Sequence, residues 1–336
     1  MAQSFLERLQ AGETLVADGA TGTNLQKVGL KAGMPPEAWV MEQPEKILAL
    51  EKSFVEAGAD IILTCTFGGT RLRLKDSPYA ERAAEVNQRA VETARQATQA
   101  HPDVLVAGSM GPVGGLLKPY GPLTVDEVRE AYTEQAKALT GAGVDLLVIE
   151  TQFSLEEAKA ALEAARQAGD LQVVVSFSYD RGTRTRMVAQ SATNMVAQSA
   201  TKVVAQSATK VVAQSATNMV AQSATMMGVK PSQVVQTFQP LGVAAIGANC
   251  GTTLENMEAI VKECSAMAAG LVIWAKPNAG LPALGDDGAA TYNVTSEQMG
   301  EFANRYVQAG ARIVGGCCGS TPAHVAAIAR AVKKTK

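Results

Sequence analysis

Short apolar runs alternate with longer amphipathic stretches along most of the chain. Eight runs rich in Val, Ile, Leu and Ala predict buried β-strands. They are residues 14–18, 60–66, 104–108, 145–150, 172–177, 243–248, 270–275 and 311–316. Stretches with helical spacing predict helices at residues 44–56, 79–100, 124–142, 154–168, 232–240, 253–268, 295–309 and 321–333. Strands and helices are therefore expected to alternate.

The predicted strands are apolar on both faces, which is typical of parallel strands that helices cover on each side. Several helices lead into the next strand through an Ala-Gly turn, as at residues 57–58 and 142–143. A count of eight favours an α/β fold of the closed (β/α)8 TIM barrel type. An open doubly wound sheet is the alternative, because periodicity does not show closure.

A repetitive segment, residues 187–226, interrupts the pattern after the fifth predicted strand. It contains five octapeptide copies, which begin at Met187, Met195, Val203, Val211 and Met219. In a helix, eight residues advance about 80° beyond two turns, so the apolar positions would not form one stripe, and as a strand neither face would be apolar. We interpret the segment as an expanded surface loop within a single domain, residues 1–336. A protrusion that binds a partner is the alternative.

Composition and charge restrict the partners. Of 336 residues, 47% are hydrophobic, and the net charge is -2. Such a chain can bury a large core but lacks a broad basic surface, so neither nucleic acid nor membrane is an expected partner. The apolar runs are far shorter than the ~20 residues of a membrane-spanning helix. The N-terminal residues predict a charged amphipathic helix rather than an export signal, so we expect a cytoplasmic protein.

Reactive side chains follow the strands at their carboxyl ends, where a barrel of this type has its active site. Cys250 follows the sixth predicted strand, and Cys317 and Cys318 follow the eighth. These strand ends are close together in a barrel, so the three thiolates can reach one ion. The sequence predicts a zinc site with three cysteine ligands and one open position. A closed structural zinc site, or small core residues, is the alternative.

Three thiolates suit a zinc ion that activates a substrate thiol, because the complex then has a net charge of about -1 and a further thiolate stays nucleophilic. Hydrolytic zinc more typically uses His and carboxylate ligands. The chain has two histidines, His101 before a strand and His324 in the first turn of the last predicted helix. Both are expected to be solvated or to pack against helices.

The strand-end motifs are Asp18-Gly-Ala-Thr-Gly-Thr, Ala57-Gly-Ala-Asp-Ile-Ile-Leu-Thr-Cys-Thr-Phe-Gly-Gly, Gly108-Ser-Met-Gly-Pro, Ile149-Glu-Thr, Gly247-Ala-Asn-Cys-Gly and Gly315-Gly-Cys-Cys-Gly. Together they resemble the homocysteine S-methyltransferase family, and most of all the homocysteine-binding module of cobalamin-dependent methionine synthases. The similarity covers nearly the whole chain apart from the repeats. It implies a zinc-bearing (β/α)8 barrel that binds homocysteine as a zinc thiolate and transfers a methyl group to its sulfur, which yields methionine.

On this resemblance, Cys250, Cys317 and Cys318 match the family's zinc ligands, whereas Asp18 and Glu150 match positions associated with the amino-acid end of the substrate. The residue types agree with that role, because a buried carboxylate can pair with an ammonium group while backbone N–H groups hold a carboxylate. For each carboxylate, the alternative is a loop cap at the barrel rim.

Other residues of the same motifs are expected to complete a substrate pocket. Thr66, Phe67 and Gly68 are predicted to line it, and Asn249 to orient the cysteine loop that follows it. Gly19 is predicted to permit a tight turn that brings backbone amides near the substrate.

Two positions depart from the family's pattern: Cys65 stands where we expect Asn, and Val40 where relatives often carry Asn. Cys65 is expected to be a small buried side chain, and Cys264, on a helix, to be inert. No folate-binding barrel or cobalamin domain is expected after residue 336. The methyl donor is therefore expected to come from outside the chain.

Three functions stay open. The favoured one is methyl transfer to homocysteine from methylcobalamin, either free or on a corrinoid protein, with a small onium donor such as S-methylmethionine or betaine as the alternative. The second is a zinc methyltransferase that acts on another thiol or in corrinoid demethylation. The third is a non-catalytic zinc barrel whose repeats form an interaction surface.

Overall fold

A computed structural model describes residues 3–31, 33–180, 223–268, 270–284 and 290–333. Most of the repetitive segment, residues 187–222, lies outside the described residues. Among the described residues, no helix is both long enough and apolar enough to cross a membrane.

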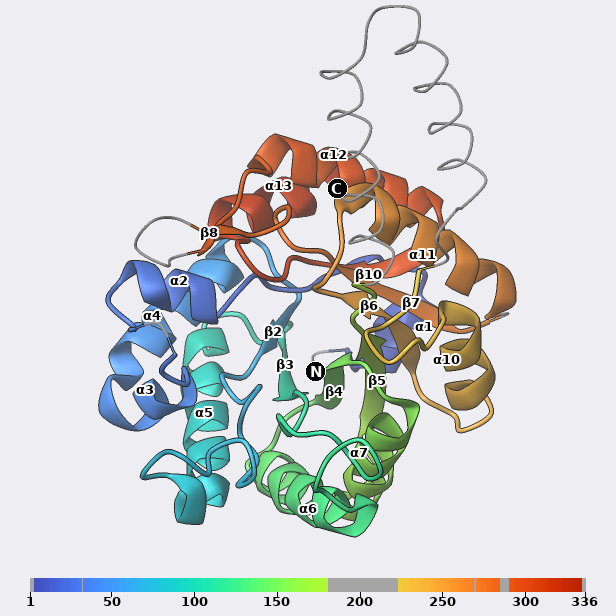
Figure 1. The fold of residues 1–336 in the computed structure, drawn as a ribbon. Helices are drawn as coiled ribbons and strands as arrows, with labels where there is room; N and C mark the ends of the chain where they lie inside the picture. The colour runs from blue at the N-terminus through green and yellow to red at the C-terminus, as the bar shows by residue number, and fades with distance from the viewer. Residues whose placement is uncertain (1–2, 32, 181–222, 269, 285–289, 334–336) are drawn as a thin grey trace, which may run out of the picture.

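Eight parallel strands form the centre of the molecule, with helices around them (Figure 1). The strands are β1 (Leu15–Val16), β2 (Ile61–Leu63), β3 (Leu105–Met110), β4 (Leu146–Gln152), β5 (Gln172–Phe177), β6 (Ala245–Asn249), β7 (Val272–Lys276) and β10 (Ala311–Val314). Their order in the sheet is β1-β10-β7-β6-β5-β4-β3-β2. Each of the eight predicted strands is present.

The two end strands of this order also meet. Ala17 and Ile61 form a parallel bridge, the Asp18 N–H donates to the Ile61 carbonyl at 3.0 Å, and the Asp60 N–H donates to the Val16 carbonyl at 2.7 Å. These contacts join β1 to β2 and close the sheet. The prediction of a (β/α)8 barrel is therefore confirmed, and the open doubly wound sheet is excluded.

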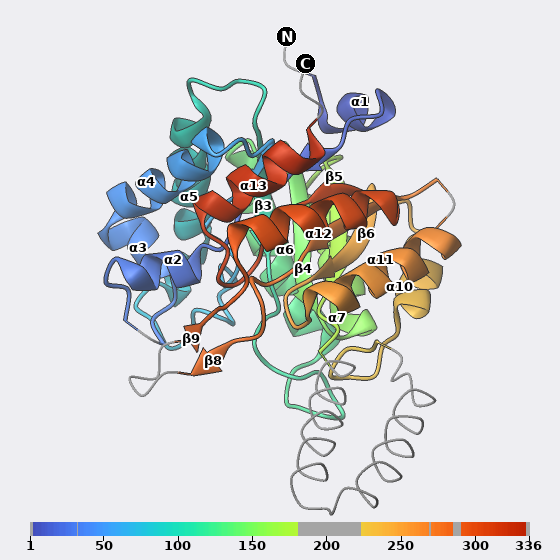
Figure 2. The ribbon, with the colours of Figure 1, turned by 90° about the horizontal axis from the view of Figure 1, so that it is seen from above.

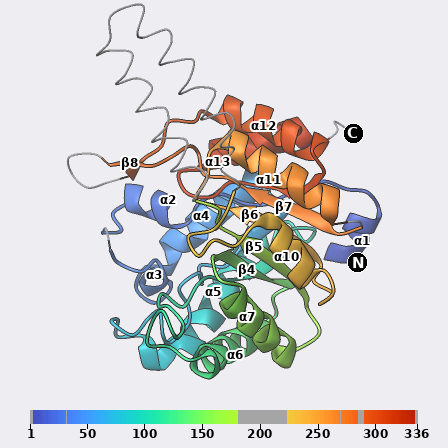
Figure 3. The same ribbon diagram turned by 45° about the vertical axis from the view of Figure 1, so that its right-hand side comes forward.

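The eight predicted helices are present with ends that shift by a few residues. They are α4 (Pro44–Glu56), α5 (Ala83–Thr98), α6 (Val125–Gly141), α7 (Leu155–Ala168), α10 (Pro231–Phe238), α11 (Leu254–Met267), α12 (Ser296–Gln308) and α13 (Pro322–Val332). Side-chain caps explain several of the starts: the Thr124 and Thr295 hydroxyls accept from the N–H groups of Glu127 and Gln298. Neighbouring helices pack side by side, as α6 and α7 do, and α12 and α13 (Figure 3).

Smaller elements join these. The predicted N-terminal helix is α1 (Phe5–Gln10), and three short helices, α2 (Gly22–Lys27), α3 (Glu37–Glu42) and η1 (Ala80–Arg82), occupy loops that follow β1 and β2. A small antiparallel pair, β8 (Ala283–Leu284) and β9 (Ala290–Thr291), follows β7. Figure 2 shows this pair and α1 at opposite ends of the barrel.

Two layers of apolar side chains form the core. Inward-facing strand residues fill the barrel, with Trp274 wholly buried among them, and Phe5 and Leu9 of α1 join this cluster. Outward-facing strand residues pack against the helices, as Val175 and Ile246 do. Alternate residues of each strand thus enter one layer or the other, which explains why the strands are apolar throughout.

The last residues of the repetitive segment belong to the barrel. Ser223, Ala224 and Thr225 are buried, whereas Met226 is 52% exposed. The Ser223 hydroxyl donates to Asn256 at 2.9 Å, and the Thr225 hydroxyl donates to the carbonyl of Phe153 at 2.8 Å. The described end of the segment therefore contacts the barrel, although the repeat pattern alone assigned residues 223–226 to the insertion.

Candidate metal and substrate site

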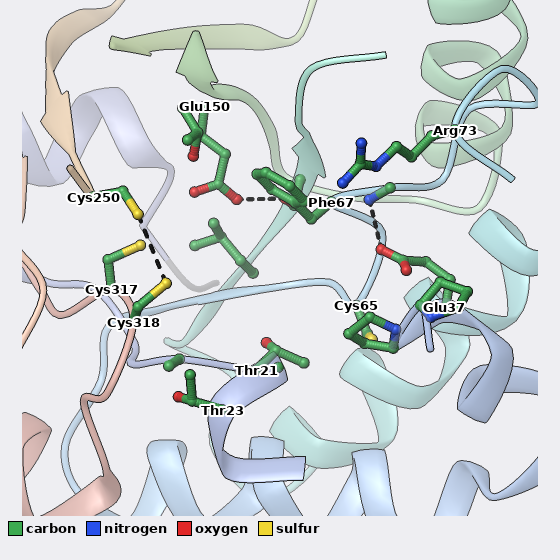
Figure 4. A pocket seen from close by; sticks show the side chains of 18 of the residues that line it. Thr21, Thr23, Glu37, Cys65, Phe67, Arg73, Glu150, Cys250, Cys317 and Cys318 are labelled. Carbon is green, nitrogen blue, oxygen red and sulfur yellow. Dashed lines mark hydrogen bonds between the residues drawn. The ribbon is translucent and has the colours of Figure 1, made fainter. Parts of the chain in front are cut away.

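Three thiols meet at the carboxyl ends of neighbouring strands. Cys250 follows β6, and Cys317 and Cys318 follow β10, with β7 between these two strands. All three sulfur atoms lie within 4.8 Å of one another, and the Sγ atoms of Cys250 and Cys318 are 3.7 Å apart (Figure 4). None of the three is in a disulfide. The sequence prediction that these cysteines converge is confirmed.

The cluster has the dimensions of a tetrahedral metal site. Zinc–sulfur bonds of about 2.3 Å place the ligand sulfurs of a tetrahedron about 3.8 Å apart, close to the separation of Cys250 and Cys318. Among the described residues, no histidine or carboxylate joins the group. All three cysteines line a cavity of about 790 Å³. These three residues could therefore hold a metal ion with a fourth position directed toward the cavity.

Backbone geometry brings Cys250 to this position. Cys250 and Gly251 have φ angles of 59° and 57°, in the left-handed region. The Cys250 N–H donates to the Lys276 carbonyl at 3.2 Å. A Cβ atom on Gly251 would lie 2.2 Å from the Ser178 hydroxyl, so only glycine fits there. The chain thus turns sharply at the end of β6.

Hydrogen bonds of Asn249 connect the cysteine cluster to β4 and β5. Its Oδ1 accepts from the Thr151 N–H at 2.9 Å and from the Ser176 hydroxyl at 2.6 Å. Its Nδ2 donates to the Thr151 hydroxyl at 2.7 Å and approaches the Cys317 sulfur at 3.7 Å. Asn249 is wholly buried and is not among the residues that line the cavity. These contacts place Asn249 next to the cysteine loop that the sequence predicts it to orient, and outside the lining of the cavity.

Two buried carboxylates line the same cavity. Asp18 accepts from Lys276 Nζ at 2.6 Å and from the Leu63 N–H at 2.8 Å, so both of its oxygens have partners. Glu150 accepts from the Ser109 hydroxyl at 2.5 Å. The structure therefore brings Asp18 and Glu150 together with the cysteines, as the sequence predicted.

Burial controls the charge of these groups. It raises the pKa of Glu150 to about 7; the nearby Lys276 opposes this rise, and Cys317 adds to it. Burial also raises the pKa of Asp18, although Lys276 counteracts it. Burial lowers the pKa of Lys276, but Asp18 and Glu150 outweigh that effect and raise it. Lys276 is therefore an ammonium cation.

Lys276 is the site residue that sequence reasoning missed. It is 3% exposed and is the last residue of β7, so it stands at a strand end like the other site residues. A lysine directly after an apolar strand run was the available signal. The rule that located the other site residues, a polar group at the carboxyl end of a strand, applies to Lys276 as well.

The remaining predicted residues divide into two groups. Phe67, Gly68 and Gly19 line the cavity, as expected. A Cβ on Gly19 would lie 2.6 Å from the Phe54 ring, so the close approach of this loop to α4 requires glycine. Thr66 does not line the cavity: its hydroxyl donates to the Ser109 carbonyl at 2.7 Å, which directs it into the barrel wall. The prediction that Thr66 lines the pocket is wrong for that reason.

The other cysteines and histidines behave as predicted. Cys65 and Cys264 are buried and distinct from the three-thiol cluster, although Cys65 lines part of the cavity. His324 packs between elements, with Nε2 2.9 Å from the Val294 carbonyl and Nδ1 beside Thr321. His101 is exposed.

Comparison with known proteins agrees with this geometry. The model of the homocysteine S-methyltransferase family matches residues 15–206 and 194–332. This chain belongs to the homocysteine S-methyltransferase family. It is 30% identical over 333 residues to methionine synthase of Mycobacterium tuberculosis (strain ATCC 25618 / H37Rv), an alignment that covers 96% of this chain and 25% of that protein. Methionine synthase of Mycobacterium leprae (strain TN) is also 30% identical, over 98% of this chain and 25% of its own length.

Solved structures support the fold of this homocysteine S-methyltransferase family member. The metallated form of the homocysteine methyltransferase MmuM from Escherichia coli has a TM-score of 0.72 with 23% identity, over 96% of this chain and 97% of that one. Its oxidized form has a TM-score of 0.71, over 97% and 98% of the two chains. The chain spans about a quarter of the length of the methionine synthases but almost all of this barrel enzyme.

Proposed function

We propose that this chain is a zinc-dependent methyltransferase that transfers a methyl group to the thiol of homocysteine and so forms methionine. One observation carries the proposal: three thiols within 4.8 Å of one another lie in a cavity that buried carboxylates also line. Membership of the homocysteine S-methyltransferase family supports the same class of reaction. The expected substrate is a small molecule with both a thiol and a charged amino-acid end.

The residues fit zinc better than other common metals. Thiolate ligands select zinc over the oxygen-preferring cations, and three ligands leave a position for substrate, unlike a closed structural site. When bound, zinc acts as a Lewis acid that lowers the pKa of a substrate thiol so that it binds as a nucleophilic thiolate. Cys250, Cys317 and Cys318 would hold the ion, and Asn249 fixes the direction of Cys317.

The cavity residues position the other end of homocysteine. Glu150 presents a carboxylate to the ammonium group, and Asp18 with Lys276 forms a second charged group in the same cavity. Fixing the amino-acid end restricts the rotation of the short side chain, which directs its sulfur toward the cysteines. Phe67 adds an apolar ring to the lining of the same cavity (Figure 4).

The donor that we favour is methylcobalamin, either free or bound to a corrinoid protein. The similarity to methionine synthases supports this choice over small onium donors. A cavity of about 790 Å³ exceeds what homocysteine alone requires, so a donor group can approach the sulfur from the open side.

The test combines metal analysis with product formation. Purified protein is expected to contain about one zinc per chain and to form methionine from homocysteine with methylcobalamin, with S-methylmethionine and betaine assayed in parallel. Cys317→Ala should lose both zinc and activity, whereas Cys264→Ala, a matched change of a buried thiol outside the cluster, should keep both. Full zinc and activity in Cys317→Ala, or no methionine with any donor, would contradict the proposal.

A further inference from the structure

Lys276 has unused hydrogen-bonding capacity at the substrate end of the cavity. A lysine ammonium group carries three N–H donors. Among the described residues, Lys276 Nζ has one hydrogen-bond partner, Asp18 at 2.6 Å. Both oxygens of Asp18 are then engaged, because the second accepts from the Leu63 N–H. The remaining N–H donors of Lys276 are therefore available to a group that enters the cavity.

The charges around Lys276 separate the two ends of an amino acid. Lys276 is a cation beside Asp18 and would repel a substrate ammonium group from that carboxylate. Within the described part of the chain, the Glu150 side chain accepts one hydrogen bond from another side chain, the Ser109 hydroxyl, and keeps acceptor capacity. An α-carboxylate is attracted to Lys276 and repelled by Glu150, and an α-ammonium group has the opposite preference. Lys276 and Glu150 line the same cavity and therefore offer one cationic and one anionic partner to the two ends of an amino acid.

We propose that Lys276 binds the α-carboxylate of the thiol substrate and that Asp18 positions Lys276, while Glu150 keeps the contact with the α-ammonium group that the proposed function gives it. This assignment rests on the proposed function and deepens it, because it restricts the substrate to thiols with an intact α-amino acid group. Recognition then has three points: the sulfur at the cysteine cluster, the carboxylate at Lys276 and the ammonium group at Glu150. Lys276 would be the residue that determines specificity for the carboxylate.

Three thiols test this assignment with zinc-loaded protein and titration calorimetry. They are homocysteine, 4-sulfanylbutanoic acid, which lacks the amino group, and 3-aminopropane-1-thiol, which lacks the carboxylate. Lys276→Met should weaken binding of homocysteine and 4-sulfanylbutanoic acid by about 10- to 100-fold, the usual effect of a charged hydrogen bond. Binding of 3-aminopropane-1-thiol should stay unchanged or tighten. Glu150→Gln is the matched control and should weaken the two amino thiols instead.

A second variant separates recognition from folding. Lys276→Met leaves Asp18 buried without its cation, so the double variant Asp18→Asn, Lys276→Met removes both charges together. The double variant should keep its zinc. Like Lys276→Met, it should no longer prefer thiols that carry a carboxylate. Equal weakening for all three thiols, or an unchanged preference for homocysteine over 3-aminopropane-1-thiol in both variants, would overturn the assignment and leave the proposed function intact. If the unaltered protein binds none of the thiols, the proposed function itself is wrong, and the assignment falls with it.

Discussion

At the scale of single residues, the rule that reactive side chains follow the ends of strands located most of the residues that line the cavity. The direction of each side chain then decides whether a residue at a strand end reaches the cavity. Asp18, Glu150 and the three cysteines all lie on the cavity, as their places after predicted strands indicated. Thr66 and Asn249 occupy equivalent places but direct their side chains into the barrel wall. Period-2 alternation is lost where strands end, so the sequence did not show which of these neighbouring residues face the cavity.

Glu150 provides a prediction about pH. Because its pKa is raised to about 7, the carboxyl is neutral below that pH and anionic above it. The ammonium group of homocysteine should therefore bind more weakly as the pH falls from 8 to 6. The ratio of the affinities for homocysteine and 4-sulfanylbutanoic acid isolates this effect, because ionisation of the thiol is common to both. That ratio should fall severalfold in the parent and stay constant in Glu150→Gln. A ratio that is independent of pH in the parent would refute this role.

At the scale of elements, the apolar pattern predicted every strand of the barrel and every helix that covers it. The pattern did not predict α2, α3 or the β8–β9 pair, because these elements are too short to establish a periodicity. The loops that follow the strands are more important for the site than these short elements. The turn after β6 places Cys250 through two consecutive residues with positive φ, and sequence alone gave only the glycine as a signal.

Replacing Gly251 should therefore disrupt the metal centre without unfolding the barrel. A Cβ there would meet the Ser178 hydroxyl at 2.2 Å in a backbone conformation that costs Ala about 1–2 kcal/mol. We expect Gly251→Ala to lower zinc affinity at least tenfold, as measured by competition with a chelator. Gly141→Ala is the matched control, since a Cβ at Gly141 has no atom within 4 Å. Equal zinc affinity in the two variants would show that this turn does not position Cys250.

At the scale of the whole molecule, barrel closure brings together residues that are far apart in the chain. β1 meets both β2 and β10, which places Asp18 beside Leu63 and next to the cysteine loop: the Gly316 N–H donates to the Asp18 carbonyl at 2.9 Å. A strand count could favour such closure but could not establish it. The sequence also did not show where the repetitive segment joins the barrel, because the last copy contributes buried residues.

Deletion of the repeats tests this junction. Removal of residues 187–222 should leave zinc content, thermal stability and methyl transfer close to those of the parent, because the cost of loop closure depends only logarithmically on loop length. Removal of residues 187–226 should also delete the hydrogen bonds of Ser223 and Thr225 and lower the stability by about 1–3 kcal/mol. A loss of transfer from a protein-bound donor alone, in the shorter deletion, would indicate that the repeats dock that donor. Equal stability of the two deletion variants would contradict the claim that residues 223–226 help to stabilise the barrel.

X-ray absorption at the zinc edge tests the central claim most directly, namely that Cys250, Cys317 and Cys318 hold a zinc ion whose fourth position takes the substrate sulfur. Without substrate, the spectrum should show three sulfur ligands at about 2.3 Å. Addition of homocysteine should raise the number of sulfur ligands to four, with release of a proton near neutral pH. A shell that already contains four sulfurs, or one that stays at three when homocysteine is bound, would contradict the account.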